Sequence, residues 1–261
     1  MINNSNIQSF EIRFETSENT PPPYSYTYIL KGTPKEQHLA LDYQIVYTLR
    51  DDLSVDEIVG QGFSLNDDID LDGEVSALWT EQFSQLLKKT KISTKRTENS
   101  NANFLEIDIV NELGEKSTFS PVNHEQWEYL CEELSQALLE VRQVERPLLL
   151  RFKKISPNEY AEFQFITEFS KRSVLIKSKA KNAVAKEVSL SWQEGKDFLE
   201  LVFKPDYFVE EAQTDEPISQ NGFFINIGDE FWYEAGQSLM NRSEKVNLIA
   251  KIEKQLNDFF V

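Results

Sequence analysis

The feature that most constrains the fold is a series of short segments in which apolar and polar residues alternate. Residues 9–16 place two phenylalanines and an isoleucine on one side, and residues 24–30 and 39–49 repeat the alternation with tyrosines and leucines. Alternation of period two predicts half-buried β-strands. Because parallel neighbours need a crossover of about a dozen or more residues, we expect these strands to form an antiparallel meander.

Two later segments have helical spacing instead. In residues 75–90 and 123–142 apolar side chains recur every three or four positions, which predicts two amphipathic helices. Residues 51–73 show neither periodicity and are expected to form an acidic loop before the first helix. Further strands are expected at residues 91–97, 104–110 and 116–119. Strands followed by a helix therefore occur twice in succession.

Arg146-Pro147 is the expected boundary between two units, residues 1–145 and 146–261, because proline ends a helix. The second unit is expected to contain a hairpin around Glu194-Gly195, with a helix as the alternative for its second arm. Its other predicted elements are strands at 148–155, 160–169, 174–181, 188–192, 198–203 and 223–233 and a helix at 244–259. The predicted fold class is α+β, with antiparallel sheets each backed by one or two helices.

Composition excludes several classes of protein. With 261 residues, 40% of them hydrophobic, the chain can bury a sizeable core. The single cysteine, Cys131, excludes an internal disulfide, and two histidines, His38 and His124, exclude a multi-histidine metal centre. No apolar run approaches the roughly 20 residues of a membrane span, and residues 1–6 lack the basic and apolar regions of a secretory signal. We expect a cytoplasmic protein that holds no cofactor and binds no membrane.

The net charge bears on the choice of partner. The chain carries 44 acidic and 27 basic side chains, a formal net charge of −17. Such a charge disfavours nonspecific binding to nucleic acid, which depends on Lys and Arg at phosphates. Residues 151–186 differ from the rest, because they contain nine basic and three acidic residues. A confined anion-binding face is therefore an open alternative in this segment.

The sharpest local motif is an alternation of aspartates. Asp68, Asp70 and Asp72, followed by Gly73, are similar to the first half of an EF-hand calcium loop. The twelfth position of such a loop supplies a bidentate carboxylate, but Trp79 stands there. The alternative is an acidic helix start, in which carboxylates stabilise the positive end of the helix dipole. We favour the helix start and assign no metal site.

Catalytic patterns are weaker still. Cys131 and His124 are seven residues apart on one predicted helix, hence about 10.5 Å apart along its axis. A thiol and its base need heavy atoms roughly 3 Å apart. Cys131 also belongs to the apolar stripe of the helix, so we expect it in the core. No glycine-rich phosphate loop occurs, and no class of enzyme is supported.

The remaining candidate is a basic strand face. Lys177, Lys179 and Lys181 fall on one side of a predicted strand, and Arg151 and Lys153 do so on an earlier strand. Nearby aromatic residues could stack on bases. In the order of its elements the chain resembles whirly-type and PC4-type single-strand-binding proteins, which implies a single-stranded nucleic acid as ligand. The alternative is that the lysines protect an edge strand from unwanted pairing.

Two functions follow from these observations. The first is a non-catalytic binding or regulatory protein that acts through a protein partner, using sheet edges and the acidic segment 51–74. The alternative is a single-stranded nucleic-acid binder that uses the basic face within residues 151–186. Salt-dependent binding to oligonucleotides would separate the two, because contacts to phosphates weaken as salt rises.

Overall fold

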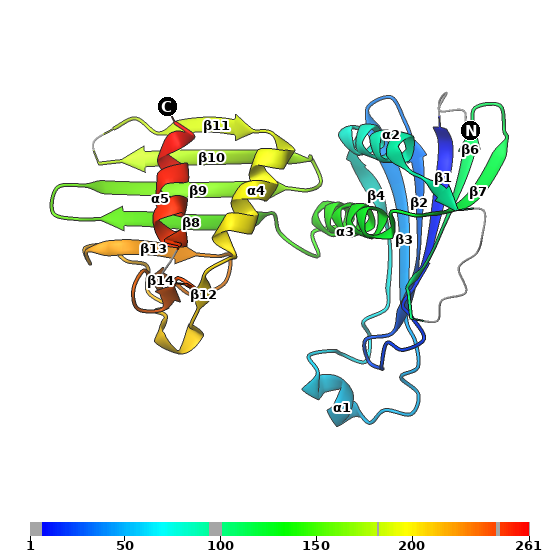
Figure 1. The fold of residues 1–261 in the computed structure, drawn as a ribbon, viewed down its shortest axis with the longest axis horizontal. Coiled ribbons are helices and arrows are strands. Elements are labelled where there is room, and N and C mark those ends of the chain that lie inside the picture. Colours follow the sequence, from blue (N-terminus) through cyan, green and yellow to red (C-terminus); the bar gives the residue numbers. More distant parts are fainter. Residues whose placement is uncertain (1–6, 94–100, 182, 244–245, 261) are drawn as a thin grey trace. The chain divides into compact units, whose positions relative to one another are not determined.

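The computed structural model describes residues 7–93, 101–181, 183–243 and 246–260. The chain divides into two compact units: unit 1 comprises Met1–Arg146 with Phe169–Lys171, and unit 2 comprises Pro147–Glu168 with Arg172–Val261 (Figure 1). The segment 1–6, on which the argument about a secretory signal rests, lies outside the described residues. So do residues 94–97 of the strand predicted at 91–97.

Within the described residues, unit 1 contains a seven-stranded sheet in the order β4-β3-β2-β1-β6-β7-β5. Neighbouring strands pair antiparallel throughout. The strands are β1 (Ile7–Glu15), β2 (Tyr26–Pro34), β3 (His38–Tyr47), β4 (Ile69–Ser76), β5 (Ile92–Ser93), β6 (Phe104–Asn111) and β7 (Lys116–Pro121). The predicted antiparallel meander of the first three strands is confirmed, and with it the α+β class.

Two helices, α2 (Leu78–Lys89) and α3 (His124–Val141), lie on the same face of this sheet (Figure 1). The alternating apolar residues of the strands point to that face, and Phe10 of β1 stacks on Phe83 of α2 with ring centroids 4.0 Å apart. At Gly73 of β4 an added Cβ would lie 2.8 Å from Leu138 of α3. The absence of a side chain there lets α3 pack closely on the strand.

The acidic segment between β3 and α2 is not the loop that periodicity predicts. It contains the short helix α1 (Val55–Gly60) and the edge strand β4, which pairs with β3 from Ile45↔Ile69 to His38↔Ser76. Residues 68–75 alternate acidic and apolar side chains, so Val75 is buried while Asp70 and Asp72 are exposed. This is a strand pattern with one solvated face, and the prediction of a helix start at the aspartates is wrong.

Unit 2 has a six-stranded antiparallel sheet in the order β11-β10-β9-β8-β13-β14. Its strands are β8 (Leu148–Ile155), β9 (Tyr160–Glu168), β10 (Ser173–Ala180), β11 (Lys186–Leu190), β13 (Gly222–Asn226) and β14 (Tyr233–Glu234). A small ladder joins β12 (Asp206–Tyr207) to β15 (Leu239–Met240), and η1 (Val209–Glu211) lies between them in sequence. Helices α4 (Trp192–Val202) and α5 (Leu248–Asp258) cross one face of the sheet (Figure 1).

Helix α4 replaces the predicted hairpin around Glu194-Gly195. The strand predicted at 198–203 is wrong, and the alternative of a helix in its place is confirmed. Ser191 is the N-cap residue: its hydroxyl accepts from the Glu194 backbone N–H, and the Glu194 carboxylate accepts from the Ser191 N–H. This capping box satisfies two backbone donors at the helix start. Phe198 and Val202, one turn apart, are both buried against the sheet. Among the described residues, no helix is long and apolar enough to cross a lipid bilayer.

Candidate functional site

The predicted basic face exists as a surface of the unit 2 sheet. The register puts Arg151 of β8, Gln164 of β9 and Lys177 of β10 in one row across three strands. The next row contains Lys153, Glu162 and Lys179. The sequence therefore brings these cations to one face, where residues of β9 separate those of β8 from those of β10. The phenylalanines of β8 and β9 point to the opposite face, into the core: Phe152, Phe163 and Phe165.

Three of the five cations are already paired with carboxylates. Lys153 is 4% exposed; its Nζ lies 2.5 Å from Glu216 Oε1 and donates to the Pro217 carbonyl at 3.1 Å. Arg151 Nη1 lies 3.6 Å from the other oxygen of Glu216, and Lys177 Nζ lies 3.2 Å from Glu187 Oε2. A buried, paired lysine is not available to a phosphate without the loss of its partner.

Lys179 and Lys181 are exposed, and neither forms an ion pair within the described residues. The structure corrects the edge-protection hypothesis for these lysines. Strand β10 pairs with β9 on one side and β11 on the other, so it is not an edge strand. Among the described residues, the edge strands of this sheet are β11 and β14.

The three aspartates do not converge. Asp70 and Asp72 are two residues apart on β4, which spaces their Cα atoms roughly 7 Å apart along the strand. Asp68 precedes the strand and accepts a hydrogen bond from the Tyr47 backbone N–H at 2.8 Å. In the part of the chain that the structure describes, no three His, Cys, Asp or Glu residues are grouped so as to hold a metal ion.

Cys131 is buried at 2% exposure in the core of unit 1, as its place in the apolar stripe predicts. Burial raises the pKa of its thiol to about 12, although a hydrogen bond with Tyr28 lowers it. The two histidines lie beside carboxylates instead: His124 Nδ1 is 4.0 Å from Glu128, and His38 Nε2 is 3.2 Å from Glu74. Within the described residues, no contact joins the thiol to either imidazole, and burial disfavours the thiolate that a nucleophile requires.

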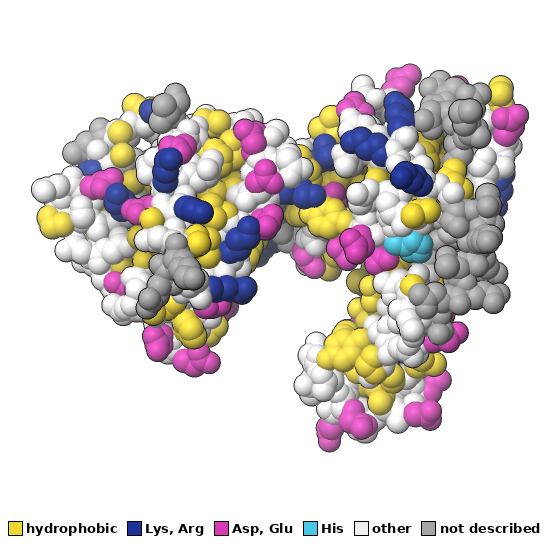
Figure 2. All heavy atoms as spheres, in the orientation of Figure 1, with side chains coloured by type: hydrophobic (Ala, Val, Ile, Leu, Met, Phe, Trp, Pro, Cys, Tyr) yellow, Lys and Arg dark blue, Asp and Glu magenta, His cyan; other side chains and the backbone are white. Residues whose placement is uncertain are grey.

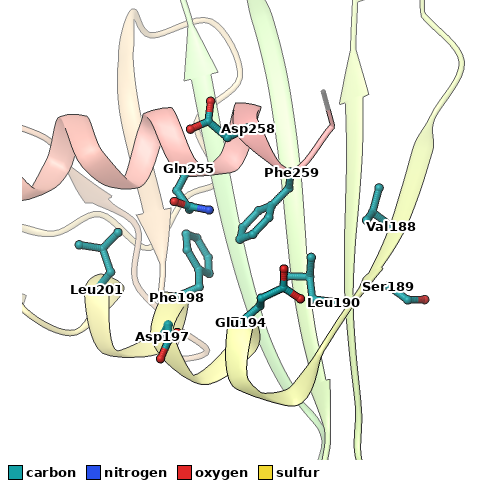
Figure 3. Close-up of a pocket in the computed structure, with 10 residues that line it drawn as sticks. All are labelled: Val188, Ser189, Leu190, Glu194, Asp197, Phe198, Leu201, Gln255, Asp258 and Phe259. Atoms are coloured by element: carbon teal, nitrogen blue, oxygen red, sulfur yellow. The ribbon is translucent and has the colours of Figure 1, made fainter.

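A groove in unit 2 was not predicted from the sequence. It is about 490 Å³ in volume and lies between α4, α5 and strand β11 (Figure 3). The rings of Phe198 and Phe259 meet edge to face at its centre, with centroids 5.4 Å apart. Val188 and Leu190 of β11 form the adjoining apolar wall. The remaining lining residues are Ser189, Glu194, Asp197, Leu201, Gln255 and Asp258.

The groove opens beside the free edge of the sheet. Val188 and Leu190 pair with Ile176 and Val174 of β10, so their side chains continue the buried face of the sheet to its last strand. Among the described residues, β11 pairs only with β10. The apolar face of the sheet and its ladder of backbone hydrogen bonds therefore both end at β11, where no further described strand covers the one or extends the other.

Negative charge lines this groove. Glu194, Asp197 and Asp258 project around its apolar centre (Figure 3). The pKa of Glu194 is lowered by hydrogen bonds from the side chain and backbone of Ser191, so this carboxylate stays ionised at neutral pH. The arrangement can receive apolar side chains at its centre and cations at its rim.

The groove was missed because it depends on α4, where a hairpin was predicted and a helix was only the alternative for its second arm. The signal that could have revealed it is Ser191-Trp192-Gln193-Glu194, a serine followed three residues later by a glutamate. The convergence of α4 with α5, about 60 residues later, carries no comparable local signal. The chain matches no known protein family, no curated protein and no solved structure.

Proposed function

We propose that the protein is a cytoplasmic, non-catalytic binding protein that holds an extended segment of a partner protein along β11. The observation that carries the proposal is the free edge of β11 beside the groove of α4 and α5. An extended peptide that joins a sheet edge gains backbone hydrogen bonds, and pockets for its alternate side chains supply specificity. Strand β11 provides both features: a backbone edge that is free among the described residues, and the side chains of Val188 and Leu190 that line the groove.

The groove defines the chemistry of the segment. In a strand added to β11, every second side chain would point to the face of Val188 and Leu190 and enter the groove. Phe198 and Phe259 favour an apolar side chain there. The carboxylates of Glu194, Asp197 and Asp258 favour lysine or arginine at the ends of the contact. The expected partner segment therefore has apolar residues at two alternate positions and a basic residue two positions before and two positions after them, all on the face that enters the groove.

The test uses the full chain and the eight-residue peptide Lys-Ser-Val-Ser-Val-Ser-Lys-Ser, with binding measured by calorimetry. Two N-methylated forms are compared, one methylated at the two valines and one at the serine that follows each valine. In a strand these two sets of N–H groups point to opposite edges. Loss of binding for one form alone supports strand addition to β11. Equal affinity of both forms would show that no backbone ladder is formed.

A pair of protein variants tests the groove itself. Phe259→Ala removes a ring from the centre of the groove and is expected to weaken peptide binding about tenfold. Phe203→Ala is the matched control, because Phe203 follows α4 but does not line the groove. Circular dichroism verifies that both variants fold. An unchanged affinity for folded Phe259→Ala contradicts the proposed site.

The alternative function, single-stranded nucleic-acid binding, keeps one supporting observation. Lys179 of β10 is exposed on the side of the sheet opposite the helices, and Lys181, which follows the end of the strand, is also exposed. The alternative is weaker because Arg151, Lys153 and Lys177 already have carboxylate partners.

A further inference from the structure

A row of aromatic rings lies on the helix-covered face of the unit 1 sheet and continues beyond the helices. Phe14 of β1 stacks on Tyr28 of β2 with centroids 4.7 Å apart, and Tyr28 lies 5.7 Å from Tyr43 of β3. Tyr26 is 5.5 Å from Phe14 and 5.8 Å from Tyr47. The row thus crosses three neighbouring strands without interruption.

The rings become more exposed toward the end of β2 and β3 that the helices leave uncovered. Tyr28 and Tyr43 are 8% and 7% exposed, Tyr26 and Tyr47 are half-buried, and Tyr24 is 43% exposed. Phe63, from the segment after α1, meets Tyr24 and Tyr47 edge to face at 5.3 and 5.6 Å. Figure 2 shows hydrophobic side chains gathered on this lower part of unit 1, over α1 and the adjoining ends of β2 and β3.

One cation already lies on these rings. The guanidinium carbon of Arg50 is 4.0 Å from the centroid of Tyr47 and 4.8 Å from that of Phe63. Arg50 is held there by Asp67, at 2.8 Å, and by the Pro23 carbonyl. The electron-rich faces of this cluster therefore attract positive charge, and Tyr26, the next ring in the row, carries no such cation within the described residues.

The carboxylate charges of Glu128 and Glu132, both on α3, act on Tyr26 and contribute to its raised pKa. Glu128 accepts from Asn103 Nδ2 at 3.0 Å, and Asn103 accepts from the Ser17 N–H at 3.1 Å, which locates Glu128 at the end of β1. Glu132 is one helical turn further along α3 and forms no ion pair among the described residues. Burial first, and then the charges of Glu128 and Glu133, raise the pKa of Glu132. The charge of Glu132 in turn contributes to the raised pKa of Tyr26 and Tyr43.

We propose that the surface formed by Tyr26, Tyr47 and Glu132 binds a lysine or methylated-lysine side chain of a partner protein. Ring faces attract an ammonium group, and an adjacent carboxylate without a cation supplies its counter-ion. Charge complementarity extends over the surroundings, because residues 1–87 contain 15 acidic and 4 basic side chains. This site lies in unit 1 and does not depend on strand addition at β11.

The first experiment varies only the ligand. Three ten-residue peptides of glycine and alanine carry, at one central position, lysine, trimethyllysine or the neutral analogue in which carbon replaces the quaternary nitrogen. Binding to the full chain is followed by NMR of the tyrosine ring protons. A cation–π site binds trimethyllysine at least as tightly as lysine and the neutral analogue about tenfold more weakly. Equal binding of the neutral analogue, or no binding of any peptide at roughly millimolar concentration, would overturn the proposal.

The second experiment varies the protein. Tyr26→Leu and Glu132→Gln are each expected to weaken lysine-peptide binding several-fold, whereas Tyr26→Phe keeps the ring and retains affinity. Glu81→Gln, on the exposed face of α2, is the matched control for loss of one carboxylate. If Tyr26→Leu does not fold, Tyr47→Leu takes its place. Lysine-peptide binding that is unchanged in a folded ring variant but lost at high salt shows general attraction to an acidic surface and contradicts the site.

Discussion

Gly195 allows α4 to lie directly on strand β10. An added Cβ would be 2.6 Å from Val174 Cγ2 and 3.0 Å from its Cγ1, and Val174 is itself buried. We expect Gly195→Ala to lower the free energy of unfolding by about 1–3 kcal/mol, because a methyl group must be forced into a filled core. Urea denaturation measures the effect.

Gly60 offers the matched control, because an added Cβ there meets nothing within 4 Å. Gly60→Ala is expected to be neutral or to stabilise α1 by up to about 1 kcal/mol, since alanine has the higher helix propensity. If Gly195→Ala proved equally harmless, α4 would not pack on β10 as closely as described.

Cys131 gives a second test at the level of one residue. Its thiol is buried and has a pKa raised to about 12, so almost none is thiolate at neutral pH. An alkylating reagent is expected to label the native protein slowly and the urea-unfolded protein rapidly. Mass spectrometry of both reactions over time measures the ratio of the rates. Rapid labelling of the native protein near pH 7 would contradict the burial of Cys131 in the core.

Among the secondary-structure elements, the hydrogen-bonded cluster around Asp108 links three strands of unit 1. Arg13 of β1 lies 2.9 Å from the Asp108 carboxylate on β6, and Lys116 of β7 lies 3.0 Å from it. Burial raises the pKa of Asp108, but hydrogen bonds from Thr118, Lys116 and Arg13 outweigh it, so the net pKa is lowered from its ordinary value of 3.8. A lowered pKa means that the folded state favours the ionised carboxylate.

The sign of the pH dependence follows. The stabilisation by ionised Asp108 is fully present above its unfolded pKa and is lost as the pH falls through the lower, folded value. We expect Asp108→Asn to lower the free energy of unfolding at pH 7 by about 1–3 kcal/mol. The difference from the parent protein should shrink as the pH falls below about 4. Thermal unfolding of both proteins between pH 3 and 7 measures it, and a difference that does not vary with pH contradicts this account.

The elements differ in how far the sequence predicts them. Strands β1, β2 and β3 could be predicted because their alternation is local and their connections are short. Strand β4 has the same alternation, but its aspartates also fit a metal loop or a helix start, and only its pairing with β3 decides between them. In α4 the capping signal at Ser191 competes with β-favouring residues at 198–203. Packing of Phe198 and Val202 against the sheet decides that case.

The candidate sites follow a similar rule. The shared face of Arg151 and Lys153 on β8, and that of Lys177 and Lys179 on β10, could be predicted, because period two is enough to place alternate side chains of a strand together. The pairing of Arg151 with Glu216, more than 60 residues later in the sequence, could not be predicted, and that of Lys177 with Glu187 depends on the register of β10 with β11. The aromatic surface likewise joins Tyr26 and Tyr47 with Phe63 through contacts between separate segments. Convergence of this kind depends on tertiary structure.

For the whole molecule, the net charge of −17 opposes the approach of any polyanion. Binding of a nucleic acid would therefore depend on a few cations that no carboxylate neutralises. Lys179 and Lys181 are exposed, while Lys177 pairs with Glu187 at 3.2 Å. Three lysines in such surroundings cannot supply the many phosphate contacts on which single-strand binding depends.

We therefore expect no submicromolar binding of a single-stranded oligonucleotide at roughly 0.15 M salt, measured by fluorescence anisotropy. Replacing Lys177, Lys179 and Lys181 by glutamine should leave partner-peptide binding at β11 unchanged, because none of the three lines the groove. If the lysines instead contact phosphates, the parent protein should bind tightly and the triple variant should lose that affinity. The slope of log affinity against log salt should then flatten by about 0.7 for each contact removed. Those two results would show that the ligand is a nucleic acid and not a protein, because a peptide bound along β11 can produce neither of them.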